Sequence, residues 1–239
     1  SHWYPRIEPS IEFGVYVADP APGTWSSLCV RQADALMLLV RASSPPGPWA
    51  VLNSALRGGN TTPHRAGLVL IHDGVITGGA TARWLEAQPG VAHHHVTEPA
   101  DVLRVARLLT GHGNGLVLSG GGARGFAHIG IVKALREANI PIDLVGGTSM
   151  GGILGAGVAS RWSIEEMTER FRRSFVDVNP LRDYTFPIVS LVSGRRVSRL
   201  LHREFGDVTI EDLPLPFFCV SSNLTTGHSD VHKRGLLWR

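Results

Sequence analysis

Three observations predict an α/β fold with a mostly parallel sheet for this chain of 239 residues. Short apolar runs of about four to eight residues, bounded by Gly, Pro or Asp, recur along it, as buried strands do. Segments with apolar residues at helical spacing separate these runs, and this alternation is typical of parallel sheets covered by helices. The hydrophobic content of 43% and the charged content of 18% are those of a globular protein that buries a core.

Residues 1–110 are expected to form an accessory α/β region with no phosphate-binding loop and no chemistry of its own. Strands are expected at 11–18, 35–42, 67–74 and 91–96, with helices at 24–34, 80–88 and 99–111. Pro, Gly and Asn predict loops at 43–49 and 57–64. The third helix ends at Gly111 and has one apolar face, made of Val102, Val105, Ala106 and Leu109. We place the domain boundary at this helix.

Residues 112–239 repeat the alternation with clearer signals. Strands are expected at 115–118 and 142–147, and helices at 125–139, 150–160, 163–175 and 195–205. Ser163 and Glu166 form a capping box for the third of these helices, whose apolar side is Ile164, Met167, Phe171 and Phe175. The fourth ends at Gly206, and residues 217–235 predict two strands around a turn at Thr226 and Gly227.

The glycine-rich loop at residues 120–125 allows three interpretations. Gly120, Gly122 and Gly125 match the G-x-G-x-x-G dinucleotide fingerprint, but Asp143 lies at the start of the second strand, whereas the ribose-binding acid lies at its C-terminal end. A phosphate-binding P-loop requires a Gly-Lys-Ser/Thr that does not follow here. A tight turn between strand and helix without chemistry stays open for the loop taken alone.

A second motif, Gly-Thr-Ser-Met-Gly at residues 147–151, follows the next strand. It is the G-x-S-x-G pattern of a nucleophile elbow, in which the serine lies on a sharp turn between strand and helix. Gly147 and Gly151 are needed because side chains there would collide as the chain reverses. Neighbouring parallel strands would bring this turn and the glycine loop to the same edge of the sheet. The bare loop amides would then suit the oxyanion of acyl transfer through Ser149.

At these residues the chain resembles the patatin-like phospholipases, and more closely their neuropathy target esterase branch of lysophospholipases. The phrases VRQAD, LLTG, IPIDLVGGTSMGG, YTFPIVSLVSG, IEDLPLPFF and GLLWR resemble that branch in the same order, over almost the whole chain. The resemblance implies a three-layer patatin-like fold for residues 112–239 and hydrolysis of acyl esters of lysophospholipids or phospholipids, without metal or organic cofactor. It implies that Ser149 is the nucleophile, in an elbow of Gly147, Thr148, Met150 and Gly151, with an oxyanion loop of Gly120, Gly121, Gly122 and Arg124.

The resemblance also implies a Ser-Asp dyad without histidine. The family's aspartate lies in an Asp-Gly-Gly or Asp-Gly-Ala motif after the LWR phrase, and this sequence stops within that phrase at Arg239. Asp73 precedes a glycine but lies far upstream, and Asp143 is one strand length from Ser149. We therefore expect the base beyond residue 239, so that this N-terminal portion of the catalytic domain is inactive alone. A non-catalytic lipid-binding or scaffold module is the alternative.

Charge and composition restrict the partners. The net charge of +3 comes partly from basic clusters at 170–173 and 195–199, interpreted as solvated helix faces, with attraction to a membrane surface left open. No recognition motif accompanies the charge, so nucleic acid is not expected as a partner.

The histidines at 93–95 alternate in direction along a strand and cannot converge on one ion, so no metal site is expected. His128 is expected to be a packed or capping histidine, and Arg124 to brace the loop.

Two observations concern the cellular location of the protein. The sequence leaves the oligomeric state open. Cys29 and Cys219 lie far apart in apolar runs, so we expect no disulfide framework and a reducing compartment. No apolar run reaches the roughly 18 residues that cross a bilayer, and the start of the chain lacks a secretion signal. We expect the cytoplasmic side of a membrane, with peripheral association or an anchor outside this chain.

Overall fold

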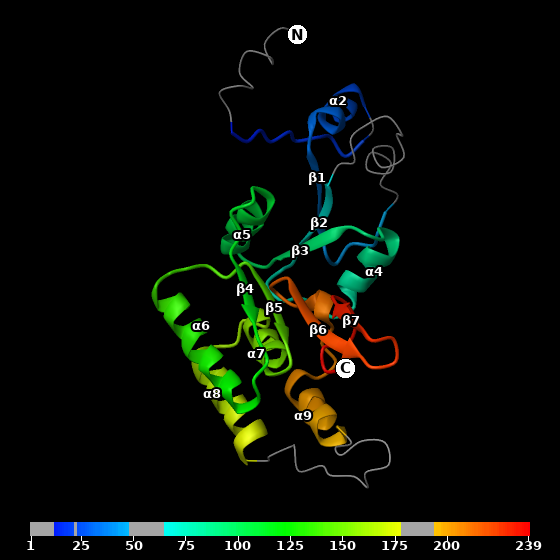
Figure 1. The fold of residues 1–239 in the computed structure, drawn as a ribbon. Coiled ribbons are helices and arrows are strands. Elements are labelled where there is room, and N and C mark those ends of the chain that lie inside the picture. Colours follow the sequence, from blue (N-terminus) through cyan, green and yellow to red (C-terminus); the bar gives the residue numbers. More distant parts are fainter. Residues whose placement is uncertain (1–11, 22, 48–64, 178–193) are drawn as a thin grey trace.

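The α/β class predicted from the sequence is confirmed by the computed structural model, which describes residues 12–21, 23–47, 65–177 and 194–239 (Figure 1). Two sheets lie in the described part of the chain, one of three strands in the order β1-β2-β3 and one of four in the order β4-β5-β6-β7. All strand pairs in them are parallel except β6 with β7. The sheets are therefore mostly parallel, as expected.

The first sheet contains β1 (Ala35–Arg41), β2 (Arg65–Ile71) and β3 (Ala92–Val96). Its helices are α2 (Thr24–Gln32), α4 (Ala80–Ala87) and α5 (Pro99–Leu109). All six agree with the expected elements. The core on one face of this sheet is formed by Trp84 of α4 with Leu68 and Leu70 of β2, each at most 1% exposed. Of the two expected loops, residues 43–47 form neither helix nor strand, and the rest lies outside the described residues.

The strand expected at residues 11–18 is wrong for residues 12–18, which form no strand; residue 11 lies outside the described residues. Phe13, Val15 and Val17 are 53%, 89% and 80% exposed. Alternating apolar residues form a strand only where one face is buried and a neighbouring strand pairs with the backbone. Neither condition is met by these residues.

Helix α5 buries only part of the apolar face expected for it. Gly111 does follow the helix with φ of 79°, as predicted for its end. Val105 is buried as expected, but Val102 is 56% exposed, whereas Asp101 and Arg104 are 2% and 3% exposed. The buried face of α5 thus combines Val105 with two charged side chains, which take part in the ion pairs described below.

The second sheet contains β4 (Gly115–Leu118), β5 (Leu144–Thr148), β6 (Phe217–Asn223) and β7 (His228–His232). Its helices are α6 (Ala127–Glu137), α7 (Met150–Ala159), α8 (Ile164–Phe171) and α9 (Arg195–Phe205). Shorter helical segments are η2 (Gly122–Phe126), the π-helical η3 (Arg172–Asp177) and η5 (Ile210–Asp212). The helix expected from residue 125 therefore begins as a 3₁₀ turn before α6.

Local predictions for this second unit are confirmed except that only half of the capping box forms, because the Glu166 carboxylate pairs with Arg170 at 2.7 Å. The Ser163 hydroxyl accepts a hydrogen bond from the Glu166 N–H at 3.0 Å, which caps α8. Met167 and Phe171 are buried beneath that helix. Gly206, with φ of 58°, ends α9, and Gly227, with φ of 72°, lies in the turn between β6 and β7.

Each sheet has its own buried cluster, and α5 and the turn after it connect the two units. The larger cluster surrounds α7, whose Leu154 and Val158 are at most 2% exposed. Cys29 and Cys219 are both free. Within the described ranges, no helix combines the length and apolar character needed to cross a bilayer.

Candidate active site

Ser149 occupies the turn between β5 and α7. Its backbone has φ of 52° and ψ of −129°, and its side chain is exposed. A positive φ is uncommon for a residue other than glycine and carries a cost in backbone energy. Thr148 ends β5 with its hydroxyl donating to the Val220 carbonyl at 3.1 Å, and Met150 begins α7. The turn thereby presents the serine hydroxyl to solvent at the carboxyl end of the sheet.

The glycines on either side of Ser149 are required by close backbone approaches. A Cβ added to Gly147 would lie 2.5 Å from the Gly151 carbonyl oxygen and 2.7 Å from the Gly152 nitrogen. A Cβ added to Gly151 would overlap the carbonyl oxygens of Leu118 and Ser119. Backbone atoms cannot move aside as a flexible side chain can. The spacing of these glycines therefore follows from the tight reversal of the chain and from its contact with the end of β4.

The glycine loop lies against Ser149, because β4 and β5 are neighbouring parallel strands. A Cβ on Gly120 would be 2.9 Å from the Ser149 Cβ and 3.5 Å from its Oγ. Gly121 and Gly122 are exposed, and Gly122 has φ of 55°. Gly125 closes the loop where a Cβ would overlap the Met150 side chain. The two predicted motifs are thus side by side at one edge of the sheet.

Arg124 is exposed on η2. Its backbone N–H donates to the Gly121 carbonyl at 3.2 Å. Its guanidinium has no hydrogen bond or ion pair with a described residue, so the expected bracing of the loop is not seen there.

The aspartates considered as bases lie elsewhere. Asp143 precedes β5, at the opposite end of that strand from Ser149, and is fully buried. Burial disfavours its charge, but hydrogen bonds from Arg107 and from the Asn114 N–H lower its pKa overall. Asp73 is exposed and paired with Arg41. The Ser149 hydroxyl has no hydrogen bond to any residue that the structure describes.

His128 contacts the glycine loop from the first turn of α6. Its Nε2 is 3.0 Å from the Ser119 carbonyl oxygen. The half-buried ring therefore holds the residue that connects β4 to the loop, in agreement with the expected packed or capping role.

The histidines of β3 alternate in direction as expected. His93 and His95 place their Nε2 atoms 2.9 and 2.8 Å from the same carbonyl oxygen, that of Glu211 in η5. The Nδ1 of His95 is 2.8 Å from the Nε2 of His72. His94 does not share this acceptor. Burial lowers the pKa of His95 to about 3 and, with a contribution from Arg104, that of His94 to about 4.

These contacts have a chemical consequence, because a carbonyl oxygen only accepts hydrogen bonds. His93 and His95 must both carry their proton on Nε2, and His72 then donates to the free Nδ1 of His95. Burial lowers the pKa of all three rings, which favours their neutral forms. No group of three or more His, Cys, Asp or Glu side chains is placed to hold a metal ion among the described residues.

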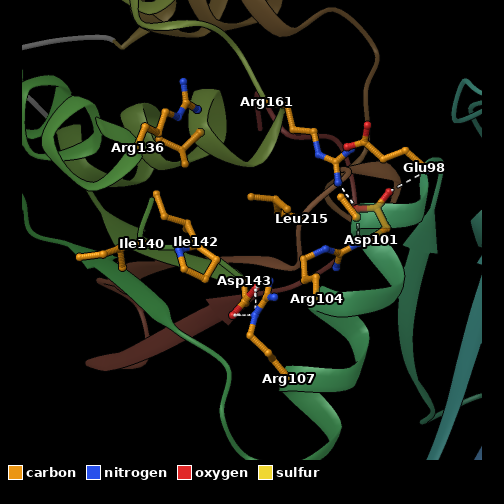
Figure 2. A pocket seen from close by; sticks show the side chains of 13 residues that line it. Glu98, Asp101, Arg104, Arg107, Arg136, Ile140, Ile142, Asp143, Arg161 and Leu215 are labelled. Atoms are coloured by element: carbon orange, nitrogen blue, oxygen red, sulfur yellow. Dashed lines mark hydrogen bonds and ion pairs between the residues drawn. The ribbon is translucent and has the colours of Figure 1, made fainter. Parts of the chain in front are cut away.

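A cavity of about 270 Å³ lies between α5 and the second unit (Figure 2). Arg161 donates to both Glu98 and Asp101, and buried Arg104 also donates to Asp101. Burial disfavours the Asp101 carboxylate, but hydrogen bonds from Thr97 and Arg161 lower its pKa to about 2. Asp143, which precedes β5, also lines this cavity. The cavity therefore lies at the opposite end of β5 from Ser149. These ion pairs join the two units, and sequence patterns did not indicate them.

Two protein-family profiles match this chain, one after the other along the sequence. A family profile described as "Patatin-like phospholipase" matches residues 116–238, and one described as "Neuropathy Target Esterase family P-loop like domain" matches residues 1–112. No lysine occurs in residues 1–112, so the Gly-Lys-Ser/Thr of a phosphate-binding P-loop is absent there.

Full-length relatives align along nearly the whole chain. "Neuropathy target esterase sws" of Drosophila grimshawi is 35% identical over 99% of this chain and 18% of its own length. The proteins of the same name from Drosophila persimilis and Drosophila melanogaster are 36% and 34% identical, each over 99% of this chain and 19% of their own length. The chain thus spans less than a fifth of the length of these curated relatives.

Proposed function

This chain belongs to the patatin-like phospholipase family, and from that membership we propose that Ser149 is the nucleophile of a lipid ester hydrolase. Its substrates would be acyl esters of lysophospholipids or phospholipids, met at the cytoplasmic surface of a membrane. The observation that carries the proposal is the exposed serine with φ of 52° at the end of β5, with Gly120 packed against it. An ordinary turn does not require a strained serine held beside a glycine-rich loop.

In the proposed reaction the Ser149 hydroxyl attacks the ester carbonyl while a base takes its proton. The carbonyl oxygen becomes an oxyanion, and the N–H groups of Gly121 and Gly122 would bind it. Collapse of this intermediate expels the glycerol-side alcohol, which takes up the proton, and leaves an acyl-serine. Water then releases the fatty acid and restores Ser149. Both glycines are exposed and have no side chain of their own that could shield their amides, which supports this role.

We propose that the base is an aspartate supplied by sequence outside these 239 residues. This assignment is supported by the lack of any described carboxylate hydrogen-bonded to Ser149, and by the ion pairs that occupy Asp143 and Asp73 elsewhere. A serine without a base is a poor nucleophile. The 239-residue segment alone should therefore react at least about 100-fold more slowly than the full-length protein.

The test is labelling of the full-length protein with a fluorophosphonate, together with release of fatty acid from a lysophospholipid. Ser149→Ala should abolish labelling and lower hydrolysis by about 1000-fold or more. Ser160→Ala, at the other end of α7, is the matched control and should behave as the wild type. Labelling that persists in Ser149→Ala would contradict the assignment of the nucleophile. A folded wild-type protein that binds lipid but takes up no label would favour a non-catalytic lipid-binding module.

A further inference from the structure

We propose that His128 is a positioning residue of the Ser149 site, whose imidazole fixes the peptide that leads into the glycine loop. The inference rests on the proposed function, because it concerns how the loop donors are held. His128 lies on α6, outside both sequence motifs, and reaches back to the end of β4. It would not contact the substrate and would act through the loop.

The protonation of the ring follows from its partner. The Ser119 carbonyl oxygen can only accept, so the His128 Nε2, 3.0 Å away, must carry the proton and donate. Nδ1 is buried and has no hydrogen-bond partner among the described residues. Leaving such an atom without a partner costs free energy, and a phenyl ring would fill similar space without that cost. Among the contacts that the structure describes, the hydrogen bond to Ser119 is therefore the one that a histidine makes at this position and a phenylalanine would not.

The hydrogen bond to His128 orients the Gly120 N–H as well as the Ser119 carbonyl. In a trans peptide the C=O of one residue and the N–H of the next point in opposite directions from the same plane. Because the Ser119 carbonyl is directed at the imidazole, the Gly120 N–H is held pointing away from it. Gly120 is the loop residue packed against Ser149. The orientation of the peptide beside the nucleophile is thus coupled to His128.

A second contact restrains the same carbonyl. The Cα of Gly151 lies so close to the Ser119 carbonyl oxygen that a Cβ would overlap it. The Ser119–Gly120 peptide is therefore held between the nucleophile elbow and the His128 ring. Without the imidazole, one of these restraints is lost, and the following glycines are free to turn with the peptide. Oxyanion stabilisation requires donors that are oriented before the reaction, so this loss should slow the chemical step rather than weaken substrate binding.

The experiment compares His128→Phe and His128→Gln in the full-length protein. Gln places an amide N–H near the position of Nε2, whereas Phe keeps the ring and removes the donor. We expect Phe to lower kcat and the fluorophosphonate reaction rate by about 10- to 100-fold with KM changed less than about twofold, and Gln to restore most of the rate. His202→Gln, at an exposed histidine of α9, is the matched control and should leave both rates unchanged.

Three results would overturn the inference. His128→Phe could react at the wild-type rate, or His128→Phe and His128→Gln could lose activity equally. Either result would show that the hydrogen-bond donor at residue 128 does not determine the rate. A loss expressed mainly in KM would instead place His128 in substrate binding. Melting temperatures of each variant identify losses due to unfolding, and Gln still tests the donor if Phe does not fold. A wild-type protein that takes up no label would refute the proposed function itself, which is a separate outcome.

Discussion

At the scale of single residues, the site depends on positions where a side chain has no room. Gly147 and Gly151 allow the backbone to reverse within one turn, and this reversal places Ser149 in its unusual conformation. The strain at Ser149 is offset by the packing around it, since α7 is buried along almost its whole length. A substitution at either glycine should therefore affect both stability and reactivity.

Gly151→Ala is predicted to destabilise the protein by about 2–3 kcal/mol, because its methyl group would overlap two backbone carbonyl oxygens. It should also lower fluorophosphonate labelling, since Ser119 would be displaced. Gly130→Ala in α6 is the matched control: a Cβ there meets nothing within 4 Å, and alanine should stabilise the helix by about 0.5–1 kcal/mol. Thermal unfolding measures both effects. Equal stability of the two variants would contradict the close contact at Gly151.

At the scale of elements, the basic cluster on α8 and η3 is more than a solvated helix face. Glu204 of α9 has a side chain only 2% exposed, and its carboxylate accepts hydrogen bonds from Ser174, Arg173 and Arg203. Burial disfavours its charge, but these hydrogen bonds lower its pKa overall. Arg170 of α8 also pairs with Glu204, at 3.5 Å. Arg170 and Arg173 thus join α8 and η3 to α9, and part of their charge is neutralised within the protein.

Replacing Glu204 by Gln should lower the free energy of unfolding by about 1–3 kcal/mol, because the buried acceptor for several guanidinium groups loses its charge. Glu169→Gln is the control, since its pair with Arg172 is exposed on both sides and contributes little. Chemical denaturation of the two variants at neutral pH gives the comparison. If both variants lose the same small amount of unfolding free energy, the basic cluster does not stabilise the packing of α9.

At the scale of the whole molecule, polar contacts connect the two sheets. His93 and His95 of β3 donate to the Glu211 carbonyl, and the Gly79 N–H before α4 donates to Asp212 at 3.1 Å. In addition, Arg107 of α5 donates to both carboxylate oxygens of Asp143. The accessory unit is therefore attached by hydrogen bonds and ion pairs at the end of β5 opposite Ser149 and at η5.

The histidine contacts make stability depend on pH. Burial lowers the pKa of His72 and His93 and brings that of His95 to about 3, below the value near 6.5 in an unfolded chain. The unfolded state then binds more protons, so stability is full above about pH 6.5 and is lost as the pH falls. His95 alone should cost on the order of 1 kcal/mol at pH 5.5.

The measurement is thermal unfolding between pH 7.5 and 5, roughly the window in which histidines rather than carboxylates titrate. His95→Gln should flatten the pH dependence while lowering stability at pH 7.5. His112→Gln, at an exposed histidine, is the control and should leave the slope as in the wild type. A wild-type slope of zero in this range would contradict the neutral hydrogen-bonded histidines.

Most of the strands and helices could be predicted from the sequence, and so could the pairing of the glycine loop with the nucleophile elbow. These features depend on local properties: the period of apolar residues, capping at Ser163, and glycines where backbones meet. The parallel arrangement of β4 and β5 then follows from the strand and helix alternation. The family resemblance supplied the chemical roles that remain proposals for Ser149 and its loop.

Which charges pair and which apolar runs are buried could not be predicted without the fold. Arg161 meets Asp101 from 60 positions away, and His95 meets Glu211 from 116, distances over which no sequence period operates. Residues 12–18 carry a strand-like pattern yet remain exposed, because burial depends on what packs against a segment. Periodicity and turn chemistry act between near neighbours along the chain, whereas electrostatic pairing and burial depend on the neighbours that the completed fold brings together.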